Sequence, residues 1–528
     1  MSRVSVGRLA PVEGLFTSES VADGHPDKIA DQLSDAVLDA ALRQDPQARV
    51  AVEAAIKGSS VWLFGELTGR DLTLDFPEIV RGVLSSIGHS DDRWGIDLAQ
   101  LDVRTTISLQ AAEIGDGVGE GPDTGAGDQG MMFGFASLET AEGLPTPIAL
   151  AHRLMRRHKK VREQLGLLGP DAKAQVSVRY ENGQPAGLHT IVLSSQHLAD
   201  VSLSDVRELL REEVIRPVLG TDADGAELLL NPAGTFIEGG PVADAGLTGR
   251  KIIVDTYGGF ARHGGGAFSG KDGTKSDRAG AYAARQLALT IIEAGLAPAC
   301  EVRLAYAIGV AEPVAVHLDL AGNKTLSLDP TAVAALLDSL RPRSIIERLG
   351  LTRPGFLPTA TFGHFGRPQC AWEQPAVDAL LGARITDGTT NTSKKSSPFD
   401  IQVATVLLDE ISFNNSSLTA EILPRDSRFR TVWRCLDGTI VTHIHNWAIA
   451  MGNMGKPKQY RDHFKQEMPS WVLPMPPIVR CRLCSLAIDA NQPLPTKFPQ
   501  LRKGTTTASR IAAVAEGAVQ FTPDRGGL

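Results

Sequence analysis

The segment GHPDKIADQLSDAVLDA (residues 24–40) decides how the rest of the sequence is interpreted. Apolar residues recur at three- and four-residue spacing from Ile29 to Ala41, which predicts an amphipathic helix that begins at Pro26 and stops before Asp45. Proline at the first helical position leaves the amino end of a helix open, with free N–H groups and the positive end of the dipole. The segment is therefore either an ordinary helix start or an anion-binding helix end.

Three polar residues occupy this helix start. His25 and Lys28 are donors suited to an anion, and Asp27 is a hard oxygen ligand suited to Mg²⁺, which usually arrives with phosphate. The alternative is that Asp27 only stabilises the helix dipole.

Outward from this helix, short β-rich runs alternate with helices. Strands are predicted at 50–56, 60–67, 251–256, 301–309 and 314–320, a helix at 276–294, and further alternation through 76–87, 175–180, 190–194 and 203–219. This pattern predicts an α+β protein with repeated β/α lobes.

The composition bounds the class of protein. The 528 residues are 42% hydrophobic and 22% charged, which predicts three or four domains at roughly 100–200 residues each. A net charge of −8 argues against a protein that coats nucleic acid. No apolar run reaches the roughly 18 residues of a membrane span, and residues 1–13 lack a signal-peptide core. Five cysteines, an odd number, favour a reducing compartment, so we expect a cytoplasmic protein.

The charge is divided unevenly along the chain. Residues 385–528 contain 17 Lys and Arg against 12 Asp and Glu, whereas residues 1–384 contain 36 against 49. A run of Thr, Ser, Asn and Lys at 386–397 is typical of a linker. The sequence therefore predicts two differently composed pieces.

A second motif is the glycine-rich segment 264–272, which almost matches a phosphate-binding P-loop. Asp272 stands where a Ser or Thr should hold Mg²⁺, so a strict P-loop NTPase is disfavoured. A loop that brings backbone N–H groups and Lys271 to a polyphosphate remains reasonable, and Arg250 and Lys251 add positive charge nearby. The alternative is a flexible surface loop.

Weaker signals lie elsewhere. Residues 112–130 are rich in Gly and Asp and predict a mobile loop, a candidate lid. Within it, Asp128-Gln129 either contacts a nucleoside or forms a turn. Glu53 and Glu66 lie on predicted strands, as edge positions or binding residues.

Together, and in this order, the segments 15–21, 24–39, 125–130, 246–275 and 363–367 resemble S-adenosylmethionine synthetases (methionine adenosyltransferases). The resemblance covers residues 12–383, followed by a linker at 384–400 and an unrecognised extension at 401–528. It implies an α+β fold of three similar β/α lobes in pseudo-threefold arrangement, built from interleaved segments. It also implies a homodimer or homotetramer with active sites between subunits, and no membrane or nucleic-acid partner for the catalytic unit.

The resemblance further implies that ATP and L-methionine give S-adenosylmethionine by attack of the methionine sulfur on ribose C5′, with cleavage of the triphosphate to pyrophosphate and phosphate. The family's ions are Mg²⁺, two per site, and K⁺. Catalytic positions carried over from the family are His25, Lys173, Arg250 and Lys271. Positions that bind ATP are these four with Asp128, Asp171, Phe236, Asp244, Lys251 and Ala267. Methionine positions are Glu66, Gln110, Asp244 and Lys275, and ion positions are Asp27 and Asp277 for Mg²⁺ and Glu53 for K⁺.

The sequence departs from the family pattern at three places. Gln110-Ala-Ala-Glu-Ile114 replaces the usual Gln-Ser-Pro-Asp-Ile at the start of the lid, and losing proline should loosen that hinge. Thr235 replaces a common arginine, and Glu238 stands in a normally aliphatic strand. A catalytically impaired, nucleotide-binding regulatory subunit is therefore the alternative to an active enzyme.

The extension has no assigned role. His443 and His445 would share one strand face, and with Cys481 and Cys484 they could bind zinc, although the spacing matches no standard finger. The alternative is that these cysteines bind no metal. The net charge of +5 over residues 385–528 could let the extension contact RNA or an acidic partner, or its charged side chains could simply face solvent.

Overall fold

The computed structural model describes residues 3–89, 92–110, 124–322, 326–327, 330–376, 386–387, 411–413, 416–425, 428–434 and 440–445. The chain divides into two units, Met1–Thr390 and Asn391–Leu528. None of the described helices is long and apolar enough to cross a membrane.

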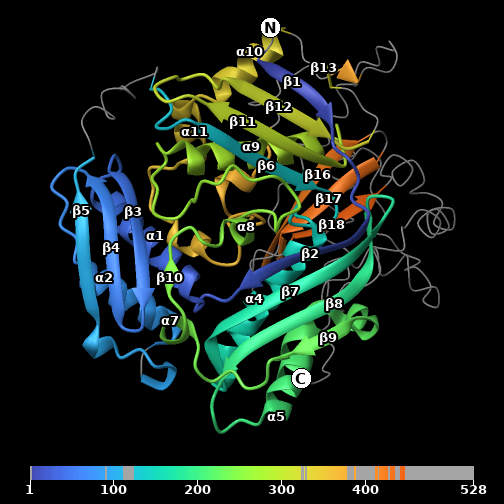
Figure 1. Cartoon of the computed structure of the whole chain (residues 1–528). Coiled ribbons are helices and arrows are strands. Elements are labelled where there is room, and N and C mark those ends of the chain that lie inside the picture. The colour runs from blue at the N-terminus through green and yellow to red at the C-terminus, as the bar shows by residue number, and fades with distance from the viewer. Residues whose placement is uncertain are drawn as a thin grey trace. The chain divides into compact units, whose positions relative to one another are not determined.

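The described part of the first unit contains three four-stranded sheets built to one plan (Figure 1). The centre of each sheet is an antiparallel pair: β3 (Arg49–Lys57) with β4 (Ser60–Thr68), β7 (Leu168–Glu181) with β8 (Gln184–His197), or β11 (Ala299–Tyr306) with β12 (Ala315–Leu320). One edge strand is antiparallel to the first strand of the pair: β10 (Gly246–Leu247), β2 (Gly14–Val21) or β6 (Gly130–Ser137). The other edge strand is parallel to the second: β5 (Asp102–Ser108), β9 (Glu227–Leu230) or β1 (Val4–Arg8).

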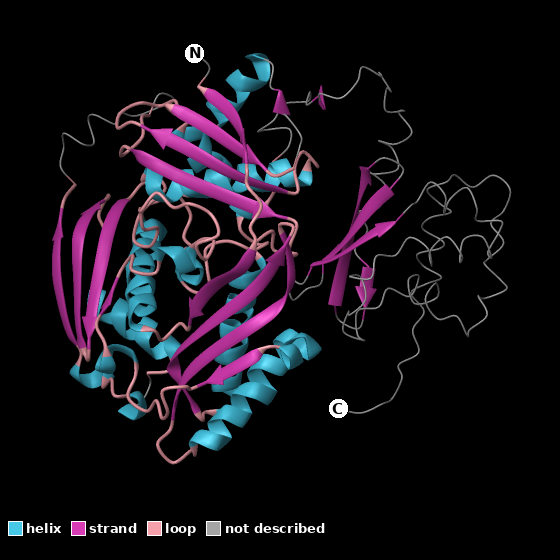
Figure 2. Cartoon of the chain, turned by 45° about the vertical axis from the view of Figure 1, so that its right-hand side comes forward, coloured by secondary structure: helices cyan, strands magenta, loops and turns pink. Residues whose placement is uncertain are grey.

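A long helix precedes each central pair and packs on its sheet. These helices are α1 (Pro26–Gln44), α4 (Thr146–Leu165) and α9 (Ser276–Glu293). Shorter helices include α2 (Phe76–Ile87), α5 (Leu203–Leu209), α6 (Arg216–Leu219), α7 (Gly240–Ala243), α8 (Ile252–Asp255), α10 (Pro330–Ser339) and α11 (Pro342–Leu349). Figure 2 shows the long helices gathered between the sheets, and most residues of α1 and α9 are accordingly buried.

The three lobes are interleaved. The strand that precedes each long helix joins the sheet of another lobe: β2 precedes α1 but pairs with β7, β6 precedes α4 but pairs with β11, and β10 precedes α9 but pairs with β3. The predicted α+β class and the three similar lobes are confirmed. Strand β1, which completes the third sheet, was not predicted.

Buried ion pairs connect the lobes in addition to apolar packing. Arg278 of α9 donates to both oxygens of Asp35 on α1, at 2.7 and 2.9 Å, and neither side chain is exposed. Asp39, one turn further along α1, accepts backbone N–H groups from residues 355–357 at 2.8–3.0 Å. Charged residues of α1 therefore hold parts of the chain that are more than 200 residues away.

One predicted strand is wrong. Residues 251–256 contain α8 instead, in spite of the β-branched run Ile252-Ile253-Val254. Tertiary contacts override the β propensity of this short run, because Gly249 before α8 and Asp255 at its end are hydrogen-bonded to α1.

The described part of the second unit is one antiparallel sheet of β15 (Ile411–Phe413), β16 (Ser416–Arg425), β17 (Arg428–Arg434) and β18 (Ile440–His445). The predicted strand that carries His443 and His445 is confirmed as β18. Cys481 and Cys484 lie outside the described residues, so the zinc hypothesis stays a prediction. Most of the expected linker is also outside them, and Thr386–Asp387 forms β14, paired with β13 (Leu326–Ser327).

Candidate active site

Asp27 lies in the first turn of α1 and is buried. Its Oδ2 accepts a hydrogen bond from Nζ of Lys251 at 2.5 Å, and its Oδ1 accepts one from the backbone N–H of Leu247 at 3.1 Å. The guanidinium of Arg250 lies 3.6 Å from Oδ1. Burial acts to raise the pKa of Asp27, but the bonds from Lys251 and Leu247 outweigh it and lower the pKa. Asp27 is therefore an ionised carboxylate beside two cations.

His25 caps the amino end of α1. Its Nδ1 accepts the backbone N–H of Asp27 at 3.2 Å. Burial, and next the charge of Lys251, lower the pKa of His25 to about 4. The imidazole is thus neutral near pH 7, and because Nδ1 is an acceptor its proton lies on Nε2. His25 can offer that N–H to an anion without carrying a charge.

Other predicted residues surround these two. Lys173 on β7 is half-exposed and pairs with Glu19 at 2.5 Å, and its charge contributes to the low pKa of His25. Asp171 is buried and accepts the backbone N–H of Gly240 at 2.8 Å. Burial raises the pKa of Asp171 to about 6, and the charge of exposed Asp244 acts in the same direction. With Phe236, these residues form what we call the α1 half-site: His25, Asp27, Asp171, Lys173, Phe236, Asp244, Arg250 and Lys251.

The glycine-rich loop forms a second set of contacts. Nζ of Lys271 lies 2.6 Å from Oδ2 of Asp277, which is in the first turn of α9. The loop passes directly over this carboxylate, since a Cβ on Gly266 would lie 2.1 Å from Oδ1 of Asp277. Lys275, the residue before α9, lies 3.3 Å from Asp272.

Asp272 explains why the loop only resembles a P-loop. It is 2% exposed, and its carboxylate accepts N–H groups from Val50 at 2.7 Å and from Thr274 at 2.8 Å. Its own N–H donates to the carbonyl of Val50 at 3.0 Å. Asp272 is therefore an anchor that fixes the loop to β3, and it has no free oxygen directed to a metal.

The β3–β4 sheet brings further predicted residues to this loop. Ala51 of β3 is paired across the sheet with Glu66 and, by an isolated bridge, with Lys271. Glu53 and Glu66 are exposed. Ser276 donates to the carbonyl of Asp128 at 3.1 Å. We call this set the loop half-site: Glu53, Glu66, Gln110, Asp128, Ala267, Lys271, Lys275 and Asp277.

The two half-sites remain separate within one chain. Among the described residues, no hydrogen bond or ion pair joins a side chain of one half-site to a side chain of the other. The segment just before Arg250 does contact the glycine-rich loop, since a Cβ added to Gly249 would lie 2.7 Å from the Ala267 Cβ. Each half-site contains a lysine–aspartate pair: Lys251 is partly exposed beside buried Asp27, and Lys271 and Asp277 are both partly exposed.

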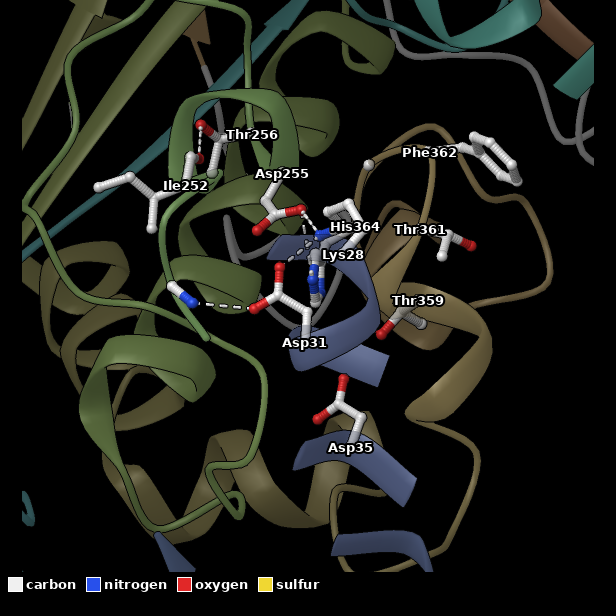
Figure 3. A network of polar contacts seen from close by, with 12 residues as sticks. Lys28, Asp31, Asp35, Ile252, Asp255, Thr256, Thr359, Thr361, Phe362 and His364 are labelled. Carbon is white, nitrogen blue, oxygen red and sulfur yellow. Dashed lines mark hydrogen bonds and ion pairs between the residues drawn. The ribbon is translucent and has the colours of Figure 1, made fainter. Parts of the chain in front are cut away.

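Lys28 was expected to be an anion donor, and this prediction is wrong. Its side chain is fully buried, and Nζ donates to Asp31 at 2.8 Å and to Asp255 at 2.5 Å (Figure 3). Burial acts to lower the pKa of Lys28, but the charges of the two aspartates outweigh it and raise the pKa. The local pair with Asp31, three residues away, does not by itself predict burial, and the second partner, Asp255, is far away in the sequence.

The departures from the family pattern fall in two kinds of place. Residues 111–123, which include most of the expected lid and of Gln110–Ile114, lie outside the described residues. Thr235 and Glu238 are exposed and lie on a loop rather than on a strand. The expectation that Glu238 disturbs an aliphatic strand is therefore wrong, since solvent accommodates its charge.

The carboxylates of the two half-sites suit a metal ion that is held partly by protein and partly by the phosphates of the substrate. No cluster of three or more His, Cys, Asp or Glu side chains in the described part of the chain could bind a metal ion by itself. Each half-site instead offers one carboxylate that is paired with a lysine, Asp27 or Asp277. Mg²⁺ typically takes one or two carboxylates with phosphates and water, which fits this arrangement.

Comparisons with known proteins agree across most of the first unit. Family models of S-adenosylmethionine synthetase match the chain as an N-terminal domain at residues 13–112, a central domain at 123–236 and a C-terminal domain at 238–374. The S-adenosylmethionine synthase of Salinispora tropica is 51% identical over 383 residues, covering 68% of this chain and 96% of that protein. That of Myxococcus xanthus is 49% identical over 381 residues, covering 71% and 96%.

Proposed function

Because the chain belongs to the S-adenosylmethionine synthetase family, it is an enzyme that makes S-adenosylmethionine from ATP and methionine, and we propose how its two half-sites divide the work. The regulatory-subunit alternative is not favoured, since relatives that are about 50% identical are synthases and the charged residues carried over from the family are all present.

The reaction needs positioning rather than a strong base. The thioether sulfur of methionine is an uncharged nucleophile with no proton to lose, so it attacks C5′ of the ribose directly. The bond from C5′ to the triphosphate oxygen breaks with its electron pair, and the sulfur becomes a sulfonium. Catalysis must therefore align sulfur with C5′ and stabilise the negative charge of the leaving triphosphate.

The cations of both half-sites would bind the triphosphate. Lys173, Arg250 and Lys251 come from the α1 half-site, and Lys271 comes from the loop half-site. His25 adds a neutral Nε2–H donor, which the helix amino end reinforces. The observation that carries this assignment is that each half-site holds a lysine against a single aspartate, so both lysines remain available to a stronger anion.

The enzyme is metal-dependent as a member of this family, and we propose Mg²⁺ at Asp27 and Asp277. Bound Mg²⁺ would supply charge neutralisation of the triphosphate. The aspartates now paired with Lys251 and Lys271 would hold it, leaving these lysines for phosphate oxygens. We assign K⁺ to Glu53, which is exposed and has no ion pair among the described residues.

We assign the other predicted residues to binding of methionine and of the nucleoside of ATP. Glu66, Gln110, Asp244 and Lys275 would hold the charged groups of methionine, and Asp128, Asp171, Phe236 and Ala267 would line the nucleoside pocket. Asp244 lies beside buried Asp171, which supports a position where the two substrates meet.

We propose that a complete site needs two copies of the chain, in a homodimer or a pair of such dimers. The separation of the half-sites supports this arrangement: the α1 half-site of one copy would face the loop half-site of another.

Within the described residues, Cys300 and Cys370 are free thiols, which supports a reducing compartment such as the cytoplasm.

Purified protein is expected to convert ATP and methionine to S-adenosylmethionine, pyrophosphate and phosphate. Activity should disappear without Mg²⁺ and fall without K⁺, with Na⁺ as the matched monovalent control. The assay is product formation by chromatography, on the full chain and on a chain that ends at Arg384. Folded protein that forms no S-adenosylmethionine with all components present contradicts the function, and activity in EDTA contradicts the metal assignment.

A further inference from the structure

Arg250 and Lys251 lie on a segment that is hydrogen-bonded to α1 at both ends. Before them, the backbone N–H of Gly249 donates to Oδ1 of Asp31 at 2.9 Å. After them, Oδ1 of Asp255 accepts from Nζ of Lys28 at 2.5 Å. The segment has few regular hydrogen bonds of its own, because α8 is only four residues long.

Lys28 connects the two ends. Its Nζ also donates to Oδ2 of Asp31 at 2.8 Å (Figure 3). Asp31 therefore contacts Lys28 with one oxygen and Gly249 with the other. All three charged side chains are almost or completely buried, Lys28 and Asp31 at 0% and Asp255 at 3% exposed. A second element supports Asp255, since the N–H of His364 donates to its carbonyl at 2.9 Å.

Such a buried cluster is a costly way to gain stability. Removing three charges from water carries a desolvation penalty that their mutual attraction often only balances, and apolar residues of similar volume would stabilise as well. What the cluster provides is geometry. Residues 27, 28 and 31 lie on one face of α1, and the contacts of Asp27, Lys28 and Asp31 set where Lys251, Asp255 and Gly249 lie.

We propose that Lys28, Asp31 and Asp255 are positioning residues for the triphosphate, which hold Arg250 and Lys251 at a fixed distance from His25 and Asp27. This inference rests on the proposed phosphate-binding role of Arg250 and Lys251. None of the three positioning residues reaches the substrate; each acts through the segment 249–255. A displacement of that segment by about 1 Å is enough to impair alignment strongly.

The test compares Asp255→Asn and Asp31→Asn with a matched control, Asp39→Asn. Asp39 lies on the same helix, is 2% exposed, and also holds a distant loop through backbone N–H groups, but that loop contains no predicted site residue. Each variant is assayed as the full chain for kcat and for KM of ATP and of methionine, and for binding of inorganic tripolyphosphate. Thermal unfolding is measured beside these assays.

Asp255→Asn is expected to weaken tripolyphosphate binding and lower kcat/KM for ATP by roughly tenfold or more, with KM for methionine changed less than about twofold. Asp31→Asn is the milder change, because its amide oxygen can still accept from Gly249. It should show the same difference between the effects on ATP and on methionine, so it tests the proposal even if Asp255→Asn does not fold. Asp39→Asn should lower the unfolding temperature without the split.

Two results would overturn the proposal. In the first, the Asp255 and Asp31 variants change both KM values alike, or Asp39→Asn produces the same split, which indicates general loosening. In the second, Lys251→Met impairs ATP turnover while Asp255→Asn and Asp31→Asn do not, which removes the positioning role alone. If Lys251→Met itself leaves ATP turnover unchanged, the underlying phosphate assignment fails as well.

Discussion

Lys271→Ala is expected to lower kcat/KM for S-adenosylmethionine synthesis by about 10²–10³-fold while the protein stays folded. Lys271 is partly exposed, its side chain is paired with Asp277 alone, and its proposed role is to stabilise charge on the departing triphosphate. The fold should tolerate the change because Asp272, not Lys271, anchors the glycine-rich loop to β3.

Steady-state kinetics at saturating Mg²⁺ test this expectation, with thermal unfolding to show that the variant is folded. Lys160→Ala is the control, since Lys160 is exposed on α4 and belongs to neither half-site. Turnover of the Lys271 variant within about threefold of the parent would remove Lys271 from the catalytic residues.

Lys251→Met is expected to cause a loss of similar size, about 10²–10³-fold in kcat/KM for ATP. Methionine keeps most of the length of the side chain and removes its charge, so triphosphate loses a cation and Asp27 loses its 2.5 Å partner. The pKa of Asp27 should then rise, because the hydrogen bond and charge of Lys251 are among the causes that lower it.

The measurement is the ATP dependence of synthesis, together with its pH profile. Ionised Asp27 is the form proposed to hold Mg²⁺, so the acid limb of the profile should move to higher pH in the variant. An unchanged kcat/KM for ATP would contradict the assignment, and an unchanged acid limb would separate Asp27 from the observed pH dependence.

The parts of the fold that local pattern controls could be predicted from the sequence. The long helix from Pro26 and the helix at 276–293 follow from apolar spacing and from signals at their ends. The interleaving of lobes could not be predicted from pattern, because the pairing of β2 with β7 or β10 with β3 joins residues far apart in the sequence. The wrong strand at 251–256 has the same cause, since long-range bonds to α1 outweigh a short β-branched run.

The site shows the same division. The sequence identified Asp27, Lys251 and Lys271 as chemically important, and the structure brings Asp27 and Lys251 into contact. The sequence could not show that Lys28 is buried, because a lysine is buried only where partners such as Asp31 and Asp255 neutralise it. It also could not show that Asp272 anchors a loop, since the bonded N–H groups belong to residues 50 and 274.

A hybrid of two inactive variants tests the central claim, that a complete site combines half-sites from two copies of the chain. Lys251→Met and Lys271→Ala chains, co-expressed with different affinity tags and purified through both, form dimers that contain one of each. If the half-sites meet across copies, one site of the hybrid has both changes and the other has neither, so the hybrid should recover about half of the parent activity per dimer. A hybrid as inactive as its two component variants would place both half-sites of each active site in a single chain and contradict the account.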